Sequence, residues 1–202
     1  MQDLALYVHS RKFYQPRWRD QHAYFGNALS AQHRRWLLDE GSLTAHLLRA
    51  SEGDFSVKII SQRWGRPQRN EAMLLAIDPR HSCLLREVFL LCSGKPWVYA
   101  RSVLPHSSLS GSLRHLRKFG DQPLGQLLFN STNMRRDPFE LTTISLQRIP
   151  GMQENTLETS SAKISGAEEQ ACLGRRSRFF LEDRPLIVSE IFLPAFWQGI
   201  QK

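Results

Sequence analysis

The chain has 202 residues, of which 41% are hydrophobic and 23% charged, as expected for a globular domain with a substantial core. No apolar run approaches the roughly 18–20 residues that a membrane-spanning helix needs. The N-terminal segment MQDLALYVHSRKFYQPRWRD also lacks the apolar stretch of a secretory leader. We therefore expect a cytoplasmic protein with no membrane span. Its three cysteines have no C-x-x-C spacing and are expected to be reduced thiols.

The formal net charge of +8 raises the question of nucleic acid or an acidic membrane surface as a partner. The basic residues are spread along the whole chain, however, and no nucleic-acid-binding motif accompanies them. A solvated basic surface that attracts small anionic substrates is the simpler interpretation, so we expect no nucleic-acid partner. The seven histidines form no H-E-x-x-H or Cys/His pattern, so we also expect no metal site.

The first half of the chain predicts an arm, a helix pair and a strand. Residues 1–29 are polar and weakly periodic, which is typical of an irregular N-terminal arm. Ser30 can cap a helix to about Glu40, and Ser42 can cap a second helix over residues 43–50. This second helix, LTAHLLRA, has too few polar groups to read bases, so the pair is expected to act as packing or as a lid. A strand over residues 55–64 follows, and then a connection to residue 78.

The segment LLREVFLLCSGKPWVYARSVLP, residues 84–105, predicts two strands joined by a Ser93-Gly94 turn. With regular alternation, Arg86 and Arg101 would lie directly opposite each other on one apolar face. Facing like charges and isolated buried charges are both unfavourable. We therefore expect an anion between or above the two arginines, supplied either by the protein or by a ligand.

The second half predicts helical segments at 110–119 and from Pro123, a strand at 139–149 and a polar, mobile loop at 150–171. A final hairpin covers residues 175–194. Its second strand, PLIVSEIFLP, repeats the pattern of PWVYARSVLP at 96–105, which leaves both chance and an internal duplication open. Under either explanation Glu190 lies mid-strand on an apolar face.

Several of these motifs, in order and with comparable spacing, resemble the chorismate pyruvate-lyase family over about residues 36–194. They are LREVFLLCSGKPWVYARSVLP, LSG at 109–111, PLGQLLF at 123–129, GRRSRF at 174–179 and PLIVSEIFLP. The resemblance implies a single α+β domain over residues 30–202, with an antiparallel sheet and helical flaps above an enclosed ligand site. It implies a cofactor-free enzyme that removes pyruvate from chorismate to give 4-hydroxybenzoate, the first step toward the ubiquinone ring.

The same resemblance implies the site residues. Leu43, Arg86, Leu124 and Glu190 would contact the ligand, with Glu190 and Arg86 as the catalytic pair. Leu43 and Leu124 each follow a helix start, where unpaired backbone N–H groups favour an anion. A bidentate arginine suits a carboxylate, and Arg101 is the candidate partner for the second, enolpyruvyl carboxylate. Glu190 could act as an acid/base or could only orient the ring hydroxyl.

Two other interpretations stay open. Arg86 could form a structural ion pair with Glu190 or Glu87. The domain could also be a ligand sensor, because effector domains of some bacterial regulators share this fold. Such regulators carry a winged-helix domain ahead of the sensor, for which the first thirty to forty residues leave no room, so we favour the enzyme. We expect a monomer with a small-molecule substrate.

Overall fold

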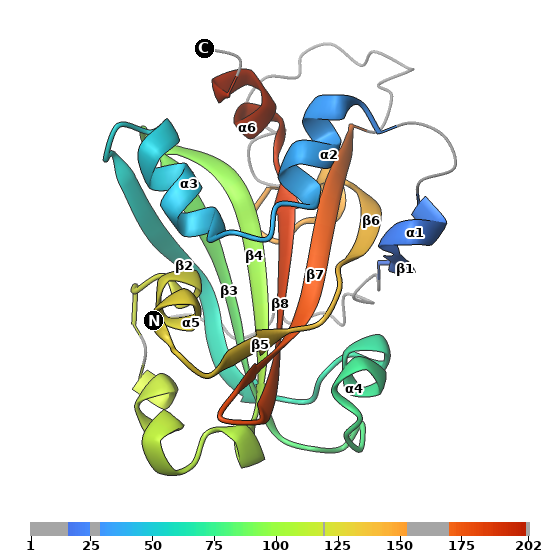
Figure 1. Ribbon diagram of the computed structural model, residues 1–202, viewed down its shortest axis with the longest axis vertical. Coiled ribbons are helices and arrows are strands. Elements are labelled where there is room, and N and C mark those ends of the chain that lie inside the picture. Colours follow the sequence, from blue (N-terminus) through green and yellow to red (C-terminus); the bar gives the residue numbers. More distant parts are fainter. Residues whose placement is uncertain (1–15, 25–28, 119, 153–169, 201–202) are drawn as a thin grey trace, which may run out of the picture.

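An eight-stranded antiparallel sheet organises the residues that the computed structural model describes, which are 16–24, 29–118, 120–152 and 170–200 (Figure 1). The strand order is β1-β6-β7-β8-β4-β3-β2, and β5 also pairs with β7. The strands are β1 (Arg19–Asp20), β2 (Phe55–Gly65), β3 (Cys83–Cys92), β4 (Lys95–Pro105), β5 (Met134–Arg136), β6 (Glu140–Ser145), β7 (Ala171–Leu181) and β8 (Arg184–Phe192). The expected α+β class with an antiparallel sheet is confirmed.

Short helices surround the sheet. The α-helices are α1 (Gln21–Tyr24), α2 (Ala31–Leu37), α3 (Leu43–Ala50), α4 (Arg69–Leu75), α5 (Leu124–Asn130) and α6 (Pro194–Gly199). The 3-10 helices are η1 (His106–Ser108), η2 (Gly111–Lys118) and η3 (Leu146–Arg148). In Figure 1, α2, α3 and α5 lie in front of the sheet. Among the described residues, none of these helices is long and apolar enough to cross a membrane.

Local sequence signals explain where α2 and α3 begin. Ser30 Oγ accepts a hydrogen bond from the His33 N–H at 3.2 Å, and Ser42 Oγ accepts one from the Ala45 N–H at 3.3 Å. These are N-cap contacts, which satisfy donors that a helix start would otherwise leave unpaired. Both predicted caps are confirmed, although α2 ends at Leu37 and so stops short of Glu40.

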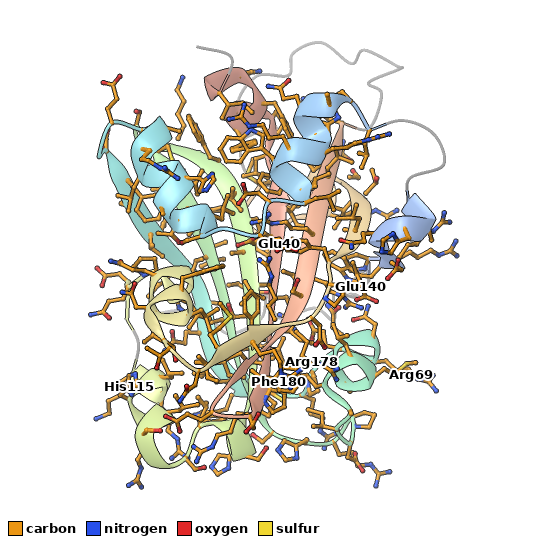
Figure 2. All side chains as sticks on the ribbon, in the orientation of Figure 1. Glu40, Arg69, His115, Glu140, Arg178 and Phe180 are labelled. Atoms are coloured by element: carbon orange, nitrogen blue, oxygen red, sulfur yellow. The ribbon has the colours of Figure 1, made fainter. Side chains whose placement is uncertain are left out.

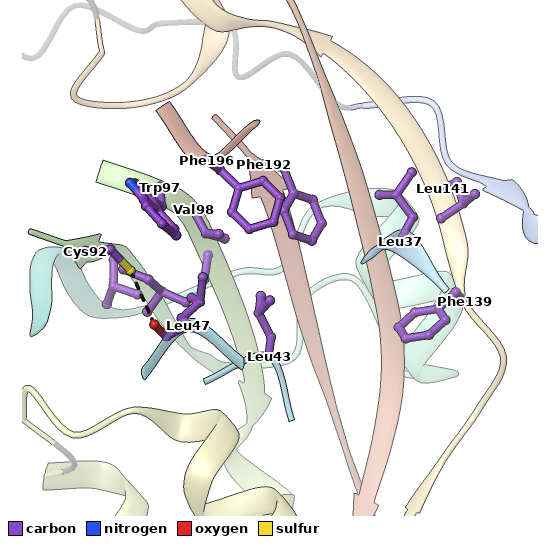
Figure 3. Packing of buried hydrophobic residues seen from close by; sticks show 13 residues of the cluster. Leu37, Leu43, Leu47, Cys92, Trp97, Val98, Phe139, Leu141, Phe192 and Phe196 are labelled. Atoms are coloured by element: carbon purple, nitrogen blue, oxygen red, sulfur yellow. Dashed lines mark hydrogen bonds between the residues drawn. The ribbon is translucent and has the colours of Figure 1, made fainter. Parts of the chain in front are cut away.

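Apolar side chains hold the helix pair against the sheet. Leu37 of α2 and Leu47 of α3 are fully buried in one cluster with Val98 of β4 and Phe192 of β8 (Figure 3). Four large buried aliphatic or aromatic groups of this kind each contribute about 1.5–3 kcal/mol through area removed from water. The helix pair is therefore a packed lid on the sheet.

The β3–β4 hairpin confirms the predicted turn and corrects the predicted register. Cys92 pairs with Lys95 across Ser93-Gly94, both of which have positive φ, as a tight hairpin turn requires. A β-bulge then shifts the pairing by one residue between Leu90 and Leu91.

As a result Arg86 lies opposite Ser102, and Arg101 lies opposite Glu87. The prediction that Arg86 faces Arg101 is wrong, because a one-residue shift sends every later side chain of β4 to the other face.

Two further expectations differ from the structure. The segment expected as a plain connection before residue 78 contains α4, whose Glu71 carboxylate accepts a hydrogen bond from the Gln68 N–H at 2.7 Å. The described part of the N-terminal arm carries β1, which pairs with β6, and the single turn of α1. Of the loop expected at 150–171, residues 153–169 lie outside the described part of the chain.

The buried thiols give a direct test of the core. Burial raises the pKa of the Cys83 thiol to about 12 and the pKa values of the Cys92 and Cys172 thiols to about 11. Because the thiolate is the nucleophile, we expect none of the three to react with an aromatic disulfide reagent at about pH 8 while the protein is folded. Reaction should occur only at the rate of unfolding, and all three should titrate in denaturant. Rapid labelling of any one of them in the native protein would contradict this packing.

Candidate active site

Two neighbouring rows of side chains cross the sheet on the face beneath α2, α3 and α5. The strand registers place Arg86, Ser102, Val188 and Ser177 in one row, from β3 through β4 and β8 to β7. The next row contains Val88, Ala100, Glu190 and Arg175. Residues directly opposite each other share a face, so two arginines and a glutamate lie on an otherwise largely apolar surface.

Arg175 is the most buried charge of this face, with 2% of its surface exposed. Its Nε donates to Glu190 Oε2 at 2.6 Å. Its Nη1 donates to the carbonyls of Trp36 at 2.8 Å and Asp39 at 2.9 Å, which lie at the end of α2 and in the loop before α3. One side chain therefore connects the sheet, the glutamate and the first flap, the helix pair α2–α3.

Arg86 makes the corresponding connection to the second flap, the η2–α5 segment. It is 4% exposed, and its Nη2 donates to the carbonyls of Gly120 and Gln122, each at 2.9 Å. Burial lowers the pKa of the Arg86 guanidinium, and nearby Asp121 opposes that effect. These contacts hold the loop that leads into α5. They do not match the structural ion pair with Glu190 or Glu87 that the sequence left open.

The two flaps meet above Glu190. Leu43 and Leu124 are the first residues of α3 and α5, so their N–H groups belong to the donors that a helix leaves unpaired. A Cβ atom on Gly125 would lie 2.8 Å from Thr44 Oγ1. Glycine at this position therefore allows the N-terminal turns of α3 and α5 to approach closely.

A small cavity of about 20 Å³ lies between the flaps and the sheet, which is room for about one water molecule. Leu43, Gly125, Arg136, Arg175 and Glu190 contribute to its walls. Ser177 also lines it, and the Ser177 Oγ is buried without a hydrogen-bond partner among the described residues. A ligand with a six-membered ring requires the flaps to move outward, and it would find polar groups ready for it inside.

Arg101 lies on the opposite face and has a different environment. Its Nε and Nη2 donate to the two oxygens of Glu71 at 2.7 and 3.0 Å, and its Nη1 donates to Glu87 Oε1 at 2.8 Å. Burial alone would lower the pKa of Arg101, but the hydrogen bond and charge of Glu71, with Glu87, raise it above its ordinary value. The structure therefore does not bring Arg101 to the cavity of Glu190. It joins β4 to α4.

The far face also carries a larger cavity, of about 690 Å³, whose walls include Trp18, Tyr99 and Arg101. The Tyr99 hydroxyl donates to Glu87 Oε1 at 2.9 Å. Arginines of β7 pair with carboxylates on this face as well: Arg176 with Glu140 at 2.6 Å, and Arg178 with Asp137 at 2.7 Å. Figure 2 shows Glu140, Arg178 and Phe180 along this part of the sheet.

The chain is similar to known proteins over most of its length. The family model described as chorismate lyase matches residues 17–202. The chain is 37% identical over 167 residues to a probable chorismate pyruvate-lyase of Pseudomonas putida, covering 83% of each chain. A probable chorismate pyruvate-lyase of Methylococcus capsulatus is 36% identical over 79% of this chain and 93% of its own. The chain belongs to the chorismate lyase family of enzymes.

A solved structure supports the fold alone. PhnF from Mycobacterium smegmatis has a TM-score of 0.52 and 15% sequence identity, and the match covers 78% of this chain and 66% of that chain.

The sequence indicated four of the residues on this face of the sheet and under the flaps, namely Leu43, Arg86, Leu124 and Glu190, of which Leu43 and Glu190 line the cavity. It missed Arg136, Arg175 and Ser177, because the arginines of the second half were interpreted as a solvated surface. The usable signal was alternation along β7, where Arg175 and Ser177 point to the same side as Phe179. In the described part of the chain, no cluster of three His, Cys, Asp or Glu side chains could hold a metal ion.

The placement of Arg101 leads to a stability prediction. We expect Arg101→Met to lower the free energy of unfolding by about 3–5 kcal/mol, because it leaves two buried carboxylates without their cation. Urea denaturation measures this loss, and adding Glu71→Gln to the same variant should recover part of it. If Arg101 were the partner of the substrate instead, Arg101→Met would keep its stability and lose kcat/KM.

Proposed function

We propose that this protein removes pyruvate from chorismate and releases 4-hydroxybenzoate. Membership of the chorismate lyase family supports this activity, as do relatives named as probable chorismate pyruvate-lyases that share 32–37% identity. The observation that carries the proposal is Glu190, a carboxylate on the sheet face beneath two flaps and oriented by Arg175 at 2.6 Å. The closed cavity provides the water-excluded setting that such a reaction needs.

The ring carboxylate of chorismate would lie under the flaps. The N–H groups of Leu43 and Leu124 at the two helix starts favour an anion, and Arg86 supplies a buried positive charge on the same face. The ring hydroxyl would then point toward Glu190. This arrangement uses every near-face residue that the family resemblance implies, and it leaves Arg101 out.

The chemistry is an elimination. The hydrogen on the hydroxyl-bearing carbon leaves, the neighbouring carbon–oxygen ether bond breaks, and the ring becomes aromatic. The departing enolpyruvyl group gains that hydrogen at its methylene carbon and leaves as pyruvate, so atoms and electrons balance without a cofactor.

Glu190 accepts a short hydrogen bond from Arg175 at one oxygen, which leaves Oε1 to accept from the substrate hydroxyl. The charge of this carboxylate is already paired with the Arg175 guanidinium. We therefore propose that Glu190 orients the hydroxyl while the hydrogen passes within the substrate.

The wider setting belongs to the same proposal. We propose a monomeric cytoplasmic enzyme without a metal or cofactor, whose product feeds the ubiquinone ring. The ligand-sensor alternative rests on fold alone, and fold does not imply function.

The deciding experiment is incubation of the purified protein with chorismate. Equal amounts of pyruvate and 4-hydroxybenzoate, at a rate proportional to enzyme concentration, are the expected result. A protein that binds 4-hydroxybenzoate but forms no pyruvate would be a sensor, and this proposal would be wrong.

The role of Glu190 predicts a specific mutational result. Glu190→Gln keeps the shape and one hydrogen bond, so an orienting role predicts a loss of kcat of about tenfold or less. A general acid/base would lose about 10²–10⁴-fold. The measurement is kcat per folded molecule, because Arg175 loses its counter-charge and the variant should unfold at a lower temperature.

Glu140→Gln is the matched control. Glu140 pairs with Arg176 at the same 2.6 Å but on the far face, so this variant should lose stability and keep kcat. Equal kcat in both variants and the wild type would remove Glu190 from the reaction.

A further inference from the structure

Arg136 is a cation of the small cavity that the family motifs did not indicate. It is the last residue of β5, pairs with Phe179 of β7 and lines the same cavity as Glu190 and Arg175. Its backbone position at the end of a short strand brings a half-buried guanidinium to the side of the cavity away from Arg86. Arg86 belongs to β3, at the other end of the row that reaches Ser177 on β7.

The contacts of Arg136 are aromatic. Its guanidinium carbon lies 4.3 Å from the centroid of the Phe139 ring, 5.9 Å from that of Phe179 and 6.0 Å from that of Phe129. Rings attract a cation through their π-electrons, but they accept none of the in-plane hydrogen bonds with which an arginine binds a carboxylate. Its donors are therefore not used up by these contacts.

Three other arginines of the sheet differ in this respect. Arg101, Arg175 and Arg176 each pair with a carboxylate at 2.6–2.8 Å. Among the described residues Arg136 forms no such ion pair, although Asp39, Glu40 and Glu190 act on it from a greater distance. Of these three carboxylates, Glu190 lines the cavity beside Arg136, and it is already engaged by Arg175.

The electrostatics of the cavity favour an added anion. Burial lowers the pKa of the Arg136 guanidinium, and the charge of Arg175 lowers it further. Two guanidinium groups thus repel each other beside a single paired glutamate. An anionic group between Arg136 and the cavity would relieve this repulsion, and a water-excluded site strengthens such an attraction.

From this geometry we infer that Arg136 binds the enolpyruvyl carboxylate of chorismate. The inference rests on the proposed lyase activity and completes it, because chorismate carries two carboxylates and the flap helices with Arg86 account for only one. It also assigns to Arg136 the contact for which Arg101 lies on the wrong face.

The assignment has a consequence for catalysis. The carboxylate that Arg136 binds leaves with pyruvate, so 4-hydroxybenzoate no longer carries it. Arg136 therefore contributes to binding of chorismate and of the transition state in which the ether bond breaks. It does not contribute to retention of 4-hydroxybenzoate. Interactions of this kind help turnover, because they do not add to product affinity.

The test separates substrate from product. We expect Arg136→Gln to lower kcat/KM for chorismate by about 10–100-fold, the effect of one charge-assisted contact, and to bind 4-hydroxybenzoate within about twofold of wild type. Steady-state pyruvate release and calorimetric titration of 4-hydroxybenzoate give the two values. Arg136→Lys, which keeps the charge, should recover part of kcat/KM and provides the answer if Arg136→Gln does not fold.

Arg135→Gln is the matched control. Arg135 neighbours Arg136 on β5, is exposed, lies over Phe180 and pairs with Asp137 at 3.5 Å, so both values should stay at the wild-type level.

Three outcomes would overturn the inference: an unchanged kcat/KM in Arg136→Gln, an equal loss of chorismate turnover and product affinity, or the same loss in Arg135→Gln. A wild-type protein that forms no pyruvate would instead defeat the proposed function itself. The two failures are therefore distinguishable.

Discussion

A guanidinium buried in the middle of an apolar sheet face has to find acceptors for its donors, and this requirement organises the site. Arg175 meets it with one carboxylate and two backbone carbonyls. The carboxylate is the candidate catalytic group, and the carbonyls belong to the flap above it. A buried charge without partners is strongly unfavourable, so the flap, the sheet and Glu190 are held in one arrangement. Closure of the flap and orientation of Glu190 are consequences of the same interaction.

Arg86 holds the second flap in the same way, through hydrogen bonds to backbone carbonyls. It donates to the carbonyls of Gly120 and Gln122 just ahead of α5, while Arg175 donates just ahead of α3. Each arginine thus sets the position of a helix start, and the two starts meet where Gly125 leaves room for Thr44. An anion bound between them would interact with both helix N-termini and with Arg86. This coupling gives a physical reason why flap closure and carboxylate binding should occur together.

Local signals predicted the turn and the helix caps, but the register depended on tertiary packing. Ser93-Gly94 and the caps Ser30 and Ser42 act within a few residues, so the sequence reveals them directly. The bulge in β4 has another cause. Trp97 and Val98, although consecutive, both pack into the cluster around Phe192 and Phe196, and nothing local to the hairpin predicts this.

The bulge also determines the face of the sheet on which Arg101 lies. It turned this side chain toward Glu71 of α4, a helix in the segment where the sequence predicts only a connection. The register and the helix both bear on Arg101, since the bulge turns its side chain to the far face and α4 supplies its partner there.

The two faces of the sheet use arginine in different ways, and the difference separates stability from function. On the far face Arg101, Arg176 and Arg178 are each paired with a carboxylate side chain, so their charges are compensated within the protein. On the near face, Arg86 donates to backbone carbonyls, and Arg175 donates both to backbone carbonyls and to Glu190. Aromatic rings surround Arg136. Carbonyls and rings stabilise a cation but carry no net negative charge. At the cavity, Arg136 and Arg175 lie beside the single carboxylate of Glu190, which already pairs with Arg175. The two carboxylates of the proposed substrate would compensate the charge that remains.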